Sequence, residues 1–245
     1  MRQGLLIFIY LAVLTALEFF IAIFISNAPL LVVVAIVKAG LVLYYYMHIY
    51  RLNEDDRQAG EHSHAYKTGT NRLGIWLFLL SDSFVFGGLM VARVNLLGLT
   101  RPELNQFLGL GVTSILLLSS FFMNRGETAM SHGDHKGFLT NTLVTGVLGV
   151  LFLVGVVFVE WRLAGDAGLT PDASAVGAVF YMMTGMHAFH VITGLIFLVI
   201  ILRNGSRGLY SPDKHWGVEA ATVYWHFIDV VWIFFYPALY LIGKI

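Results

Sequence analysis

The chain has 245 residues, of which 58% are hydrophobic and 12% charged, and its mean hydropathy is +0.76. Soluble domains carry about 25% charged residues, so this composition excludes a soluble enzyme and favours an integral membrane protein. Fifteen basic and fifteen acidic residues give a formal net charge of zero, which excludes a basic field for nucleic acid. The absence of cysteine excludes thiolate metal sites, iron–sulfur clusters and covalently attached c-type haem. We therefore expect lipid and other membrane proteins as partners.

Seven stretches are long and apolar enough to cross the roughly 30 Å of hydrocarbon in a bilayer as helices. In chain order they run Gly4–Ser26, Pro29–Tyr50, Arg72–Val94, Leu104–Met123, Phe138–Glu160, Val176–Leu202 and Glu219–Gly243. The first is too long for a signal-peptide core and is not followed by a small-residue cleavage site, so we expect it to be a membrane helix. The predicted fold class is an all-α integral membrane protein with seven transmembrane helices.

The connections divide these spans into two units. Residues 26–29, Ser-Asn-Ala-Pro, have the composition of a tight turn and predict an antiparallel hairpin over residues 1–50. Residues 51–71 are rich in charge and predict a cytoplasmic linker. Residues 72–245 then form a five-helix unit, and no connection is long enough to hold a soluble domain.

The distribution of Lys and Arg predicts the orientation, because basic residues concentrate on the cytoplasmic side of a membrane. The N-terminus and every second connection carry ten of them, the opposite side carries four, and Lys38 lies inside a span. The N-terminus is therefore expected in the cytoplasm and the C-terminus outside, in the periplasm if the membrane is the bacterial plasma membrane.

Two opposite charges lie at matching depth in the first hairpin. Glu18 precedes the turn by about as many residues as Lys38 follows it, so an antiparallel arrangement brings the two to the same level. A lone charge at mid-membrane costs about 2.5–3.5 kcal/mol on insertion scales, which favours an ion pair between Glu18 and Lys38. The alternative is that one or both face a neighbouring subunit.

Five more ionisable residues lie near mid-membrane on three later spans. His187 and His190 are three apart, as are His226 and Asp229, so each pair shares one side of its helix. Together with Asp82 they predict one buried polar cluster. It has two interpretations: a satisfied structural network, or a site that handles protons or anchors lipid.

Metal binding is not the favoured interpretation of the histidines. Three intramembrane histidines are too few for a two-haem or a haem-plus-copper centre. The others fall in predicted inner-side connections without a fixed ligand spacing: His62, His64, His132, His135 and His215. They suggest a metal only weakly, and solvated loop positions account for them. The sequence thus predicts no metal site and no catalytic residue.

Two motifs on the last two spans carry a family resemblance. Residues 181–194, YMMTGMHAFHVITG, resemble the sixth helix of subunit III of the haem-copper oxidases, and residues 215–232, HWGVEAATVYWHFIDVVW, resemble its last helix. Residues 73–82, LGIWLFLLSD, are similar to its third helix, where glutamate is common at the position of Asp82. The hairpin differs: residues 38–42, KAGLV, followed by residues 46–48, YMH, are similar to the small subunit IV of bacterial oxidases and suggest a fusion.

This resemblance implies a non-catalytic subunit that packs on subunit I, beside subunit II, in a proton-pumping oxygen reductase of aerobic respiration. Haem and copper would reside on these partners. In the family, a cleft between the two-helix and five-helix parts holds phospholipid, and the third-helix carboxylate lies near the partner, which points to Asp82. Asp is one methylene shorter than Glu, so its carboxyl group reaches less far towards a partner. Lipid or interface contacts are expected at Arg72, Trp76, Arg203, Arg207 and Glu219.

Two alternatives stay open at this stage. One is an accessory protein of nitric oxide reductase, which also resembles subunit III. The other is a stand-alone transporter or proton channel, whose membrane charges would line a path, although the inverted repeats of many transporters are not visible. The electron donor, cytochrome c or quinol, the haem type, the bound lipids and the presence of a separate subunit IV do not follow from these residues.

Overall fold

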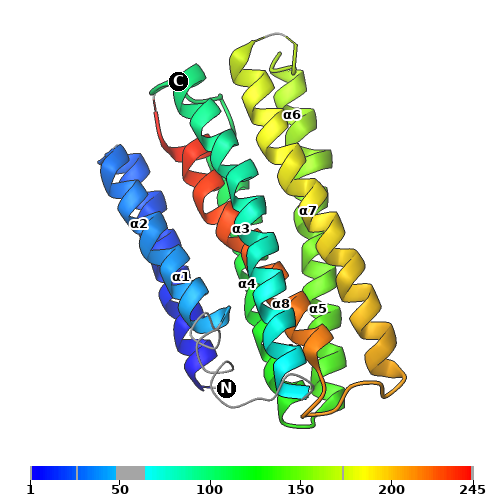
Figure 1. The fold of residues 1–245 in the computed structure, drawn as a ribbon. Coiled ribbons are helices and arrows are strands. Elements are labelled where there is room, and N and C mark those ends of the chain that lie inside the picture. The colour runs from blue at the N-terminus through cyan, green and yellow to red at the C-terminus, as the bar shows by residue number, and fades with distance from the viewer. Residues whose placement is uncertain (1, 26, 48–63, 173, 244–245) are drawn as a thin grey trace.

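A computed structural model describes residues 2–25, 27–47, 64–172 and 174–243, with side chains in the same ranges except 2–3 and 64–68. Within these ranges seven helices are long and apolar enough to cross a membrane. This confirms the predicted all-α class with seven spans. The two ends of the chain lie at opposite ends of the bundle, as an odd number of crossings requires (Figure 1).

The first unit is a helical hairpin of α1 (Arg2–Phe24) and α2 (Ala28–Leu41), which continues as a π-helical segment over Val42–Tyr46. In hydrocarbon every backbone group must be paired within the chain, so apolar stretches of this length form helices even where they are rich in β-branched residues. The Asn27 side chain caps α2 by accepting a hydrogen bond from the Leu30 amide at 3.2 Å. The cap and Pro29 in the first turn explain why the hairpin turns where the sequence predicts.

The remaining helices form the five-helix unit. Their bounds are α3 His64–Leu97, α4 Gln106–Ser131, α5 His135–Leu153, α6 Trp161–Asp166, α7 Ala175–Ser206 and α8 Trp216–Tyr236. A π-helical segment, Val154–Glu160, joins α5 to α6 into one continuous span, and a second one, Pro237–Leu241, extends α8.

Several helices are longer than hydropathy alone predicts. Helix α3 begins at His64, inside the stretch expected as a linker, and α4 continues past Met123 to Ser131. Polar residues at helix ends lie beyond the hydrocarbon, so a hydropathy pattern ends before the helix does. Polar side chains also cap the starts of α4 and α5, where Asn105 accepts from the Leu108 amide and Asp134 from the Gly137 amide.

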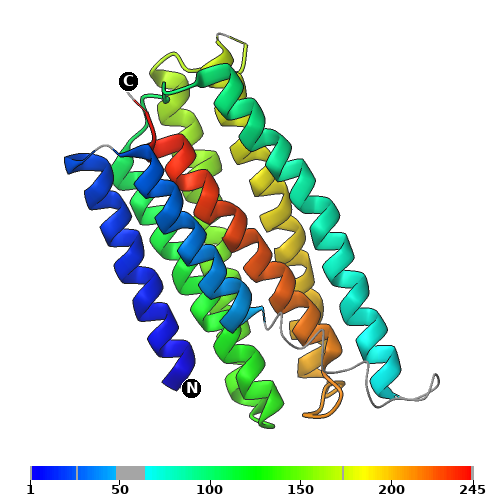
Figure 2. The same ribbon diagram turned by 60° about the vertical axis from the view of Figure 1, so that its left-hand side comes forward.

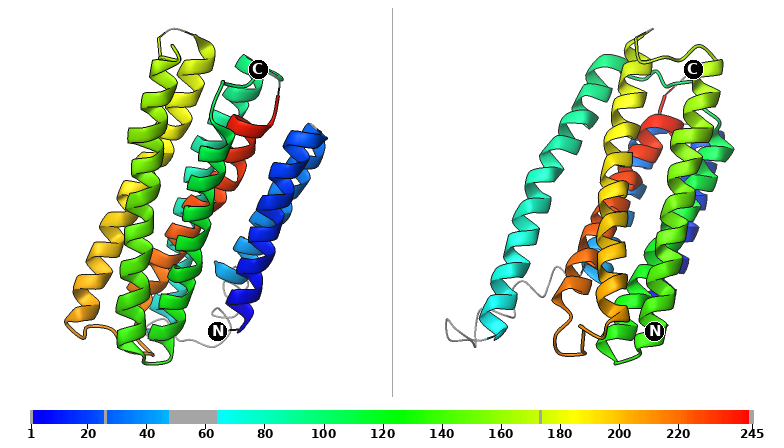
Figure 3. Two further views of the ribbon diagram at one scale, coloured as in Figure 1. Left: turned by 180° about the vertical axis from the view of Figure 1, so that it is seen from behind. Right: turned by 90° about the vertical axis from the view of Figure 1, so that its right-hand side faces the viewer.

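Helix α8 lies at the centre of the molecule. It packs against α2, α3, α4 and α7, and Figure 2 shows it between α2 and α3. Helices α4 and α5 form the most extensive helix pair. Helix α3 stands at the edge of the bundle, where it contacts α7 and α8 (Figure 3, right).

The hairpin packs directly on the five-helix unit. Its α1 contacts α4, where the ring centroids of Phe8 and Phe121 are 4.9 Å apart and those of Phe19 and Phe107 are 5.6 Å apart. These two pairs lie several turns apart on both helices, so α1 and α4 stay in contact over much of their length.

Glycines let α5 and α7 approach the central helix. A Cβ atom on Gly149 of α5 would come within 2.6 Å of Cη2 of Trp225, and one on Gly194 of α7 within 3.0 Å of Cε3 of the same ring. Real Cβ contacts are wider than this, so the Trp225 indole depends on both glycines. Glycines of α3 are different, because Gly87 and Gly88 have open space where a Cβ would stand.

Candidate functional site

The charges of the hairpin meet in its interior. The Lys38 ammonium on α2 donates to Oε2 of Glu18 on α1, and the two side chains are 1% and 0% exposed. A buried pair of this kind gains little net stability, but removing one partner leaves an uncompensated charge and is costly. The pair lies on the side of the hairpin that faces α8, since Lys38 also acts electrostatically on Asp229 of that helix.

One face of α8 carries polar residues towards the hairpin and α4. His226, Asp229 and Tyr236 follow the three-and-four spacing of one helix face, and all three are buried. The Ser120 hydroxyl of α4 hydrogen-bonds with the Asp229 carboxyl and lies 3.2 Å from Nδ1 of His226.

The end of the hairpin packs against the same polar face of α8. The Tyr46 ring lies with its centroid 4.9 Å from that of His226, and the Tyr46 hydroxyl donates to the Gly4 carbonyl oxygen at 3.1 Å. We call the group formed by Glu18, Lys38, Ser120, His226 and Asp229 the hairpin cluster. It draws on four helices and is closed to solvent.

A second polar site joins α3 to α7. Nε2 of His190 lies 3.0 Å from Oδ2 of Asp82, and Nδ1 of His190 donates to the Met186 carbonyl oxygen at 2.8 Å. Because a carbonyl oxygen only accepts, Nδ1 is the donor in the contact with Met186. The pair of Asp82 and His190 is partly exposed, with 9% of the His190 side chain and 18% of the Asp82 side chain accessible.

His187 belongs to neither site. It is fully buried, and neither ring nitrogen has a hydrogen-bond partner among the residues that the structure describes. The centroid of its ring lies 4.8 Å from that of Trp232 and 5.5 Å from that of Phe152. The five residues expected to form one cluster therefore divide among three places. Equal depth did not bring them together because helical neighbours three apart, such as His187 and His190, still point towards different partner helices.

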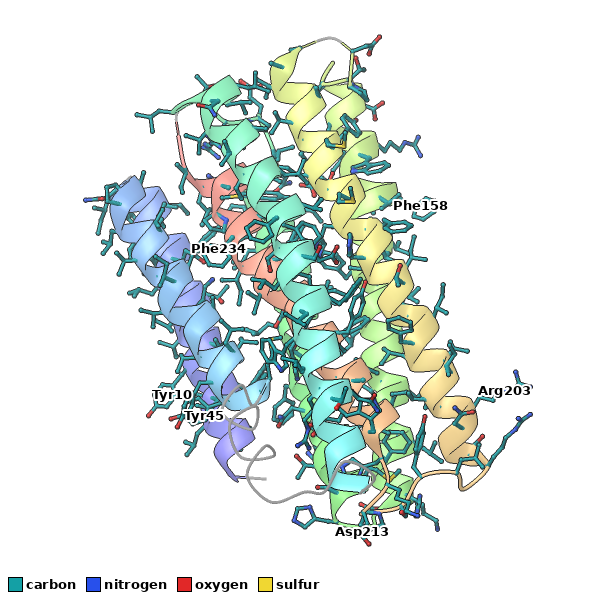
Figure 4. The ribbon with its side chains drawn as sticks, in the orientation of Figure 1. Tyr10, Tyr45, Phe158, Arg203, Asp213 and Phe234 are labelled. Carbon is teal, nitrogen blue, oxygen red and sulfur yellow. The ribbon has the colours of Figure 1, made fainter. Side chains whose placement is uncertain are left out.

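The five residues expected at lipid or interface positions lie towards one end of the bundle, where α3 and α8 begin and α7 ends (Figure 1). Arg72 of α3 makes a bidentate ion pair with Glu219 of α8, with Nε to Oε1 at 2.7 Å and Nη2 to Oε2 at 3.0 Å. Trp76 is half-buried one turn along α3. Arg203 and Arg207 are exposed at the end of α7, and Figure 4 shows Arg203 pointing away from the helices.

Two structural polar sites lacked a clear signal in the sequence. Arg93, counted as a loop charge by position, is 2% exposed and donates to four carbonyl oxygens, those of Gly98, Thr100, Ala238 and Ile242. It fastens the connection after α3 to the end of the chain. A single arginine at the end of an apolar span is the only signal that could have indicated it.

The other site is a buried carboxyl group in a π-helical segment. Glu160 accepts a hydrogen bond from the Tyr240 hydroxyl, and both side chains are buried. Arg101 donates through Nη1 to the Tyr240 carbonyl oxygen at 2.7 Å, and partial burial lowers the pKa of its guanidinium group. The extra residue of a π-helical segment turns its side chains away from the regular helical face, which no periodic pattern in the sequence reveals.

The loop histidines show no ligand geometry where the structure describes them. Nδ1 of His132 hydrogen-bonds with the Thr128 carbonyl oxygen at 2.8 Å, and Nδ1 of His215 with that of Ser211 at 3.2 Å. His62 and the side chain of His64 lie outside the described residues. Over the described residues, no three His, Asp or Glu side chains gather as a metal site would require.

Comparison with known proteins agrees with the fold. The family model for cytochrome c oxidase subunit III matches residues 3–244, a range that includes the hairpin. The chain is 36% identical over 200 residues to cytochrome c oxidase subunit 3 of Synechocystis sp., covering 78% of this chain and 84% of the relative. It is 36% identical over 179 residues to the protein of the same name from Thermostichus vulcanus (70% and 87% covered), and 30% identical over 231 residues to that of Dasypus novemcinctus (89% and 86% covered).

Proposed function

The chain belongs to the cytochrome c oxidase subunit III family, and on that premise we propose that it is the non-catalytic subunit III of a proton-pumping haem-copper oxygen reductase that oxidises cytochrome c. The observation that carries the proposal is the family match over nearly the whole chain together with seven membrane spans. The chain is then one part of a membrane-embedded terminal oxidase complex. Names of relatives favour cytochrome c over quinol as the donor, and they favour an oxidase over a nitric oxide reductase accessory protein.

In this role the chain contributes no redox centre. Haem and copper reside on subunits I and II, and this chain supplies neither metal ligand nor nucleophile. Three pairs within the chain support this division, because they engage polar groups that could otherwise serve as ligands: Lys38 with Glu18, Arg72 with Glu219, and Tyr240 with Glu160. Its contribution is to pack on subunit I and to keep the proton-uptake region intact during turnover.

The outer face of α3 is the proposed contact with subunit I. Large apolar side chains at seven-residue intervals are exposed along it, namely Leu77, Phe84 and Val91, which are 56%, 74% and 60% accessible. A helix that is apolar on its outer side faces lipid or another membrane helix. Asp82 lies on the same helix, where its pair with His190 of α7 is partly exposed.

Phospholipid is the second proposed partner. A wholly apolar groove of about 350 Å³ lies between α5 and α7, lined by residues that include Leu143, Gly146 and Leu202. Leu143 and Leu202 also line an adjoining groove of about 420 Å³ that ends at Thr140, Arg203 and Ser206. An acyl chain fits the first and an anionic headgroup the second, because arginine and hydroxyl groups bind phosphate.

The proposed setting is a bacterial plasma membrane with the N-terminus in the cytoplasm. Ten basic residues at the N-terminal side of the bundle against four at the other support this orientation. The groove that ends at Thr140, Arg203 and Ser206 would then lie at the cytoplasmic leaflet, where anionic lipids provide an additional attraction of about 1 kcal/mol per basic residue.

The test is purification in a mild detergent through a tag on this chain, followed by a reduced-minus-oxidised spectrum and mass spectrometry. The proposal predicts co-elution of a haem-bearing subunit and, after that subunit is stripped off, a chain without haem absorption. An untagged strain controls for non-specific recovery. Haem that stays with the stripped chain would overturn the assignment of roles, and so would repeated absence of any haem-bearing subunit across several gentle detergents.

A further inference from the structure

The hairpin cluster contains an odd number of charges in a place closed to water. Glu18, Lys38 and Asp229 come from α1, α2 and α8, and their exposed fractions are 0%, 1% and 3%. Lysine provides one positive charge, and two ionised carboxyl groups would provide two negative ones. The lysine therefore balances only one of the two acids.

Among the described residues, the groups around these three bring no second fixed positive charge. Ser120 faces them from α4, Tyr46 from the end of the hairpin, and His226 and Tyr236 from α8 itself. Serine and tyrosine are neutral, and the contacts of His226 with the Ser120 hydroxyl and the Tyr46 ring are ones that a neutral imidazole makes. Over the same described residues, the Tyr236 hydroxyl, Oε1 of Glu18 and Oδ2 of Asp229 have no protein hydrogen-bond partner.

An unbalanced negative charge here is expensive. Moving an isolated carboxylate from water into a low-dielectric interior costs so much that the group takes up a proton instead. Glu18 is stabilised in its ionised form, because the Lys38 ammonium donates directly to it. The Asp229 carboxyl group has no such direct contact with a described cation, and the Ser120 hydroxyl with which it hydrogen-bonds is neutral.

We infer that the hairpin cluster is a proton-binding site, in which Lys38 pairs with ionised Glu18 and one proton resides on the Asp229 carboxyl group. This makes the contact between the hairpin and the five-helix unit electrically neutral. Oδ2, which has no protein acceptor or donor, is the oxygen available to carry the hydrogen. The site lies wholly within this chain, so the inference does not rest on the proposed function.

Infrared spectroscopy of the full chain in phospholipid nanodiscs tests this, because protonated and ionised carboxyl groups absorb at different frequencies. Asp229→Asn removes a protonated acid, so the variant should lose the intensity of one protonated carboxyl group per chain while its carboxylate bands stay unchanged. Glu18→Gln on α1 should also lose the intensity of one protonated carboxyl group and leave the carboxylate bands unchanged, because Asp229 would then ionise to pair with Lys38. Lys38→Met should gain one protonated carboxyl group.

Glu219→Gln is the matched control, because it removes a carboxylate of α8 that is paired with Arg72. It should lose carboxylate intensity and keep every protonated carboxyl group. Circular dichroism shows which variants retain their helices, and the Glu18 and Lys38 variants keep the test decisive if Asp229→Asn does not fold. Loss of carboxylate intensity from Asp229→Asn, with the protonated band unchanged, would overturn the inference.

Discussion

Helices α8 and α3 both cross the membrane, yet 83% of the most apolar 18-residue stretch of α8 is buried in the protein, against 11% of that of α3. Each carries one aspartate near its middle. Asp229 of α8 is closed in by other helices, whereas Asp82 of α3 is partly exposed beside His190. Position along an apolar span therefore does not distinguish the two aspartates. The helices packed around each one decide whether its carboxyl group is enclosed in the protein or partly exposed.

The comparison has a simple consequence for the molecule. The polar groups of α8 hold the chain together, because they meet the hairpin and α4. The outer apolar side chains of α3 are exposed in the chain alone. A substitution on α8 should therefore lower the stability of the folded chain. A substitution of the same type on α3 should instead affect assembly with the partner subunits.

The largest effect is expected from removing the positive charge of Lys38, which the hairpin places near α8. Lys38→Ala leaves the Glu18 and Asp229 carboxyl groups buried without a cation, and removing one partner of a buried pair costs about 3–5 kcal/mol. Unfolding of the purified chain in mixed micelles measures the loss. The double variant with Lys38→Met and Glu18→Gln removes both partners and should recover most of the stability. Equal stability of the single variant and the wild type would show that the pair does not matter for folding.

Arg93 comes next, because it links the end of α3 to the end of the chain. Arg93→Ala leaves four carbonyl oxygens without their donor, and hydrogen bonds from charged groups contribute about 1.5–3 kcal/mol each before the loosened ends find other partners. Faster amide hydrogen exchange over residues 237–243 should report the released end. Unchanged exchange there would mean that packing alone holds the end of the chain.

Glycine substitutions sharpen the contrast between the two helices directly. Gly149→Ala forces a Cβ atom against the Trp225 ring of α8, and overpacking of this kind costs about 1–3 kcal/mol. Gly87→Ala on α3 is the matched control, because nothing lies within 4 Å of its Cβ position. Thermal unfolding of the two variants should differ accordingly, and a loss in both would contradict the exposed placement of α3.

Asp82→Asn should have the smallest effect on the isolated chain. A partly exposed ion pair contributes about 0–1 kcal/mol, so folding should be nearly unchanged. In the assembled oxidase we expect intact haem spectra and faster loss of activity during turnover, which repeated oxygen-consumption cycles measure. Loss of the haem signal itself would argue against an accessory role for this residue.

Much of the fold could be predicted because hydrophobic length marks membrane spans so strongly, and all seven are confirmed. Equal distance from the turn placed Glu18 and Lys38 at one level, where the structure pairs them. Neighbours between distant helices could not be predicted in this way. His187 lies among aromatic rings instead of joining His190, and the partners of Arg93 come from a connection and the end of the chain.

The hairpin shows a further limit of local resemblance. Short stretches at Lys38 and Tyr46 suggested a fusion with a hairpin similar to subunit IV, whereas the subunit III family model matches residues 3–244 and includes both helices. The contacts agree with that continuity, because the hairpin shares its charged cluster with Asp229 of the last helix.

Photo-crosslinking in native membranes is the most direct test of the contrast between α3 and α8. A photoreactive amino acid would be placed at Leu77, Phe84 or Val91 on α3, and at the buried Ile228 or Phe235 on α8. The account predicts adducts with the haem-bearing subunit from at least one α3 position, and only adducts within the chain from α8. Adducts with another subunit from α8, or none from any α3 position, would contradict it.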